Sequence, residues 1–126
     1  MKEYQGLEYR GRRFDCAHLM AKYFKEEFDL DTSSWNEVSR YYDIRNERQY
    51  IQNQLVEHGF VELPLESDYQ KGDVIIYLFE GVGTCCLATC INSDSAIVMN
   101  RRSHEMLIKD IPKKLNHFRH KIRMKN

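Results

Sequence analysis

The chain has 126 residues, enough for one domain with a hydrophobic core and too few for two, so we treat residues 1–126 as a single domain. Its 19 basic and 19 acidic side chains cancel, so no overall charge draws it to nucleic acid or to a membrane surface. No apolar run approaches the roughly 20 residues of a membrane-spanning helix, and the polar start Met1–Gln5 is not a signal peptide, so we expect a protein that is cytoplasmic when made.

An amphipathic helix is predicted over residues 15–30. Its apolar positions share one face and are Cys16, Leu19, Met20, Tyr23, Phe24 and Phe28, while Asp15 is placed to cap its N-terminus. Cys16 therefore stands at the helix start, where unpaired backbone N–H groups and the helix dipole favour a thiolate. The pattern alone favours a small core residue, because a lone cysteine on an apolar helical face most often packs inside.

Further helical segments are predicted at residues 35–42 and 46–58, with an interruption near Asp43 and a stop at Gly59. His58, at the end of the second segment, is expected to interact with the helix dipole.

The second half of the chain predicts a sheet. A continuous apolar run indicates a central strand at 74–79, and further strands are expected at 85–91, 96–99 and 106–108. Residues 118–122 alternate apolar and basic side chains, which predicts an edge or terminal strand with one solvated basic face. Helices followed by a meander of antiparallel strands indicate an α+β domain.

The four cysteines do not form the pattern of a disulfide framework. Cys85, Cys86 and Cys90 share one predicted strand, on which adjacent side chains point to opposite faces. We therefore expect reduced thiols and a reducing compartment. A zinc site would need a second pair of ligands, which the sequence lacks, so neither a metal nor another cofactor is expected.

The order of these parts resembles the NlpC/P60 family of cysteine peptidases, most closely its small bacteriophage-tail members. Phe14-Asp15-Cys16 at a helix start is similar to the family's nucleophile segment, and Lys71–Ile75 is similar to the approach to its first central strand. The resemblance covers residues 6–110. It implies a papain-like α+β fold in which N-terminal helices pack on a small antiparallel sheet or half-barrel.

In this family a cysteine attacks an amide of a peptidoglycan stem peptide, a histidine on the facing strand serves as base and acid, and a third polar group orients the histidine. By resemblance these positions correspond to Cys16, Cys86 and Asn100, and Tyr9 corresponds to a tyrosine that lines the oxyanion site. Cys86 thus stands where the family has histidine, and a shift of one residue would offer Cys85 instead. Neither thiol has the reach and the near-neutral pKa of imidazole.

Another histidine would have to replace the missing base. His104 lies in a predicted loop from which it could approach the site from the side. His18 stands where the family has glycine, and it should point away from Cys16 around the helix. His117 and His120 fall on the last predicted strand, where we expect them to be solvated or partly packed.

Two functions follow from the resemblance. The first is a catalytically degenerate domain, a pseudoenzyme, with a structural or binding role among phage or prophage tail proteins, because loss of the aligned base lowers rates by orders of magnitude. The alternative is an active cysteine amidase or endopeptidase that cleaves peptidoglycan stem peptides through Cys16. In either case the protein is made in the cytoplasm, and a place in the virion tail is an open alternative. Neither nucleic acid nor a membrane is an expected partner.

Overall fold

The computed structural model describes residues 4–8, 16–32, 47–79, 84–99 and 102–124. Within these ranges the helices are α1 (Cys16–Phe28) and α3 (Glu47–Glu57), and the strands are β1 (Phe60–Leu63), β2 (Val74–Phe79), β3 (Thr84–Cys90), β4 (Ser95–Met99), β5 (Ser103–Leu107) and β6 (Lys114–His120). Short 3-10 turns, η5 (Ile108–Asp110) and η6 (Lys121–Arg123), follow β5 and β6. The predicted α+β class is confirmed. The helical segment predicted at 35–42 lies outside the described residues.

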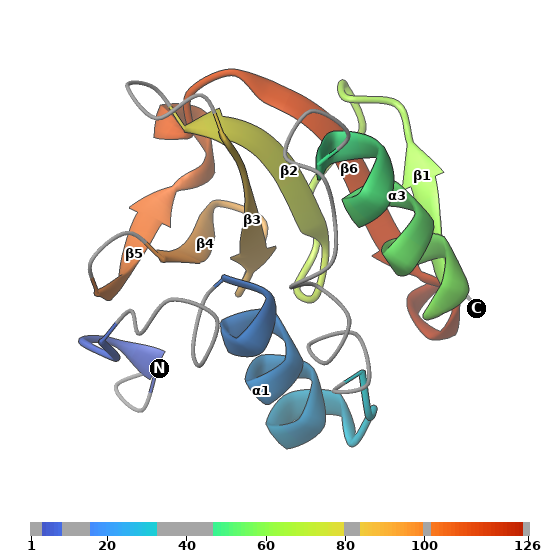
Figure 1. The fold of residues 1–126 in the computed structure, drawn as a ribbon, viewed down its shortest axis with the longest axis horizontal. Helices are drawn as coiled ribbons and strands as arrows, with labels where there is room; N and C mark the ends of the chain where they lie inside the picture. The colour runs from blue at the N-terminus through green and yellow to red at the C-terminus, as the bar shows by residue number, and fades with distance from the viewer. Residues whose placement is uncertain (1–3, 9–15, 33–46, 80–83, 100–101, 125–126) are drawn as a thin grey trace.

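The six strands form one sheet in the order β1-β6-β2-β3-β4-β5, and every neighbouring pair is antiparallel. β2 to β5 follow one another as a meander, whereas β6 enters between β1 and β2 (Figure 1). β6 is the last strand of the described chain, but the prediction of an edge position for it is wrong. β6 starts earlier than residue 118, ends at His120, and has a neighbour on both sides, because β1, a strand that the sequence did not predict, takes the edge position.

Both faces of the sheet are covered, which explains why β2 is apolar at successive positions. On one face, α1 and α3 pack against Val74, Ile76 and Leu87, and we call this side the helix face. On the other face, residues from the loop before β2 and from the η5 region pack against Ile75, Tyr77 and Ala88. We call this second side the loop face. Figure 1 shows α3 beside β1, and α1 contacts β3 and β4.

The direction of α1 across the helix face is fixed by its packing partners. Leu19, in its second turn, belongs to a buried cluster with Ile97 and Met99 of β4. Phe28, in its last turn, lies against the turn that precedes β2, where a Cβ atom added to Gly72 would come within 2.9 Å of the Phe28 ring. The N-terminus of α1 therefore lies toward the end of β4, and its C-terminus lies toward the start of β2.

Residues 4–8 lie against the start of β5, at the outer edge of the sheet. The Gly6 N–H donates to the Ser103 carbonyl oxygen at 2.8 Å, and the Ser103 N–H donates to the Leu7 carbonyl oxygen at 2.8 Å. The Ser103 hydroxyl also donates to the Tyr4 carbonyl oxygen. These bonds occupy backbone groups of β5 that an open edge would expose.

No helix in the described part of the chain is long and apolar enough to cross a membrane.

Candidate functional site

The site implied by the family resemblance is described only in part. α1 begins at Cys16, as predicted, but Tyr9 and Asn100 lie outside the described residues. β3 and β4 are antiparallel and pair at Thr89–Ile97 and Cys90–Ala96, so the start of β4 lies beside the end of β3. Leu19 shares a buried cluster with Ile91, Ile97 and Met99, so the first half of α1 packs on the β3–β4 side of the sheet.

The two adjacent cysteines of β3 point to different sides. Cys85 packs against the apolar cluster of the helix face, and Cys86 packs against the cluster of the loop face. Cys85, rather than Cys86, therefore shares a face with α1. The family resemblance in its first register assigns the histidine position to Cys86, on the side away from the helix. Both residues are half-buried thiols.

Cys90, the third cysteine of β3, is a core residue. It is fully buried on the loop face beside Ile75 and Ala88. Burial, and secondarily the nearby Asp73 carboxylate, raise the pKa of its thiol well above the usual range. Cys90 therefore stays protonated and is a poor nucleophile.

His104 does not lie on the side of α1. It pairs with Val98 across β4 and β5, so its side chain projects from the loop face, where it is exposed. Its Nδ1 atom lies 3.2 Å from the Arg102 carbonyl oxygen. At the end of α3, the His58 Nδ1 atom lies 2.8 Å from the Gln54 carbonyl oxygen, in agreement with its expected place at a helix C-terminus.

A buried polar cluster on the loop face is the strongest electrostatic feature of the described chain. The Asp73 carboxylate, with 0% exposure, has one oxygen 2.6 Å from His117 Nε2, and it accepts hydrogen bonds of 2.9 Å from Arg119 to both oxygens. The Gln70 N–H adds a further bond of 3.1 Å. Burial opposes the charge of Asp73, but the bonds from His117, Arg119 and Gln70 outweigh it, so the pKa of Asp73 is lowered.

This cluster corrects two predictions. His117 is fully buried, not solvated or partly packed, and the Arg119 side chain is only 14% exposed. The pairing with Asp73 explains both, because a buried charge needs a partner, and it raises the pKa of Arg119. His120 is partly packed, as expected. Asp73 was visible in the sequence only as part of a short Gly-Asp motif, and no local pattern connects it with a residue so distant along the chain.

Aromatic stacking continues the cluster toward the surface. The Tyr69 ring stacks on the His117 ring with centroids 4.4 Å apart, and the Lys114 Nζ atom lies 5.4 Å from the centroid of the Tyr69 ring. The buried His117 Nδ1 atom has no hydrogen-bond partner among the described residues. Tyr69 thus separates an internal Asp–His–Arg cluster from the solvent.

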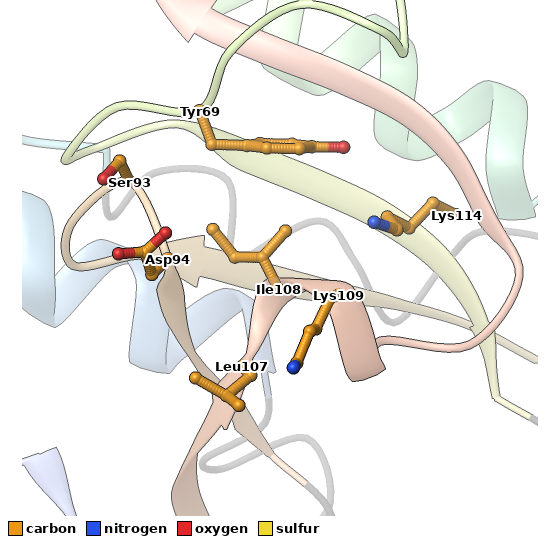
Figure 2. Close-up of a pocket in the computed structure, with 7 residues that line it drawn as sticks. All are labelled: Tyr69, Ser93, Asp94, Leu107, Ile108, Lys109 and Lys114. Carbon is orange, nitrogen blue, oxygen red and sulfur yellow. The ribbon is translucent and has the colours of Figure 1, made fainter.

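Two adjoining cavities open on the other side of Tyr69. One has a volume of about 470 Å³ and the other about 540 Å³, and both are lined by Tyr69, Ser93, Asp94 and Lys114. Figure 2 shows the first cavity, with Ser93 and Asp94 at one end, Lys114 at the other, and Ile108 facing the Tyr69 ring. Within the described residues, no three His, Cys, Asp or Glu side chains gather as metal ligands.

Comparisons with protein-family models, with curated proteins and with solved structures found no match for this chain.

Proposed function

We propose that this protein is an NlpC/P60-like domain of papain-like fold that is catalytically degenerate and has a structural or binding role among phage or prophage tail proteins. One observation supports this proposal most directly. The helix that begins at Cys16 packs on the helix face of an antiparallel sheet, and Cys85, which the shifted register of the resemblance puts at the histidine position, is a thiol on that same face.

All five histidines lie in the described residues, and none is on β3, the strand from which the resemblance expects the base. His104 projects from the opposite face, and His117 is held by Asp73. His120 is on the helix face, but it packs against Phe24 and Phe60, near the far end of α1 from Cys16. A cysteine without a positioned base is a weak acyl-transfer nucleophile at neutral pH.

The alternative is an active cysteine amidase or endopeptidase of peptidoglycan stem peptides. The position of Cys16 at the first residue of α1 supports it, because backbone N–H groups at a helix start stabilise a thiolate. Both proposals assign the same fold to the protein. They differ in whether the protein cleaves peptidoglycan stem peptides.

Turnover of defined stem peptides and of purified sacculi separates the two. We expect no release of fragments by the wild-type protein or by Cys16→Ala, with both proteins folded. Cleavage by the wild-type protein that is lost in Cys16→Ala would overturn the degenerate assignment and establish the alternative.

Paired histidine substitutions sharpen the same experiment. Cys85→His would put an imidazole on the helix face, and Cys86→His would put it on the loop face. We expect Cys85→His to be the variant that gains Cys16-dependent cleavage, because only that side chain shares a face with α1. A gain in Cys86→His alone would contradict this reading of the two faces.

A further inference from the structure

The adjoining cavities on the loop face are not used by the proposed function, which concerns the helix face. Each is of a size typical of small-ligand sites, which span roughly 300–1,000 Å³. They share four lining residues, Tyr69, Ser93, Asp94 and Lys114, and we call the two adjoining cavities together the groove.

The walls of this groove are held by bonds to the interior. Tyr69 rests on the buried His117 ring, and Arg119, which binds Asp73, also donates to the Asp68 carbonyl oxygen at 2.8 Å. On the other side, the Ile108 N–H donates to the Asp94 carbonyl oxygen at 2.8 Å. A groove whose walls are fixed in advance loses little entropy when it binds a ligand.

The two halves of the groove carry opposite charge. The first half is lined by two lysines, Lys109 and Lys114, and by one carboxylate, Asp94. Among the described residues, the second half is lined by three carboxylates, Glu66, Asp68 and Asp94, and by one cation, Lys114, which also lines the first half. A ligand that is complementary along its whole length is anionic at one end and cationic at the other.

Each half also exposes a leucine. Leu107 in the first half is 44% exposed, and Leu65 in the second half is 41% exposed. Exposed leucines on either side of an aromatic wall favour a ligand with apolar side chains between its charged ends.

We propose that this groove binds a short peptide with free termini and apolar side chains, its carboxylate toward Lys109 and Lys114 and its ammonium toward Glu66 and Asp68. Binding to the groove does not involve Cys16, so the peptide-binding proposal can be tested independently of the proposed function.

The test uses the tripeptide Leu-Ala-Leu as probe, with a form acetylated at the N-terminus and a form amidated at the C-terminus. Titration of the labelled protein is followed by the amide signals of Tyr69, Ser93, Asp94 and Ile108. We expect the free tripeptide to shift these signals, and each blocked terminus to weaken binding by about 2- to 5-fold, as for exposed ion pairs. The Cys16→Ala protein is expected to bind as the wild type does.

Matched variants assign each terminus to its end of the groove. In Lys109→Met, which keeps Lys114, amidation should weaken binding less than in the wild type, whereas Lys121→Met, at an exposed lysine of η6, should leave the effect unchanged. In Glu66→Gln, which keeps Asp68, acetylation should weaken binding less than in the wild type, whereas Glu57→Gln on α3 serves as control. An absence of shifts at millimolar peptide, equal binding of all three peptide forms, or exchanged roles of the two ends would each overturn the proposal.

Discussion

Asp73 is a carboxylate in a position where burial opposes its charge, and it is ionised only because its partners are arranged around it. Arg119 supplies two hydrogen bonds, and His117 and the Gln70 N–H supply the others. Removal of one member of such a group leaves the others buried and unpaired. The resulting loss in free energy of unfolding is larger than the net stabilisation that the intact interaction provides.

We expect Asp73→Asn to lower the free energy of unfolding by about 3 kcal/mol near neutral pH, because Arg119 and His117 lose their carboxylate. The pKa of Asp73 is lowered on folding, so its stabilising contribution is complete above its unfolded pKa of about 4 and is lost as the pH falls through the folded pKa. The difference between wild-type and variant protein should therefore shrink in acid. Urea unfolding at neutral and at acidic pH measures it.

Asp110→Asn is the control for this comparison, because Asp110 is exposed in η5. It should change the free energy of unfolding by less than about 0.5 kcal/mol at either pH. A loss in Asp73→Asn that is the same in acid as at neutral pH would contradict an ionised, buried Asp73.

The sequence predicted Cys16 at a helix start but not the cluster around Asp73. Hydrophobic periodicity reports which side of an element is buried, and it contains no information on which distant polar residue completes a buried charge. The basic residue at position 119 therefore looked like part of a solvated face, although its charge is directed inward to Asp73.

Among the elements, α1 depends on a close approach to the turn before β2. Gly72 has φ of 90°, and the Phe28 ring leaves no room for a Cβ atom there. The glycine therefore meets two requirements at once, a left-handed backbone and a short distance to the helix.

Gly72→Ala and Gly6→Ala separate these two requirements. Gly6 also has a positive φ, of 77°, but a Cβ atom there would meet nothing within 4 Å. We expect Gly6→Ala to cost about 1 kcal/mol of unfolding free energy, from backbone strain alone, and Gly72→Ala to cost about 2 to 3 kcal/mol, because Phe28 must also move. Thermal or urea unfolding measures both. Equal losses would show that the approach of α1 to Gly72 is not tight.

The sequence predicted α3, with Gly59 as its stop, and the elements with an uninterrupted pattern. α1, β2, β3 and β4 follow the helical period or a continuous apolar run. The start of β6 could not be predicted in this way. Its register with β2 shifts between Ile76 and Tyr77, and the alternation of inward and outward side chains along β6 is broken there. β1 has only four residues, Phe60–Leu63, which is too short for a pattern to show.

For the whole molecule, the α+β class could be predicted because it depends on the order of helices and strands. The sheet order could not, since β6 joins β1 to β2 through pairings between residues far apart in the chain. Pairings of this kind leave no local signal, and they also slow folding, because a long loop must close before they form.

The same strand order limits how far the nascent chain can fold on the ribosome. β1 finds no partner in the sheet until β6 has left the exit tunnel. We expect ribosome-bound chains that expose residues only up to Lys113 to be cut readily by protease around β1, and chains that also expose β6 to be protected there. Protection before β6 emerges would contradict this dependence.

Synthesis and folding are therefore separated in time for this protein. Until β6 is made, Phe60 and the apolar face of α3 have no finished sheet to cover, and they are available to chaperones or to neighbouring nascent chains. The cell has to keep that intermediate soluble until β6 can pair with β1.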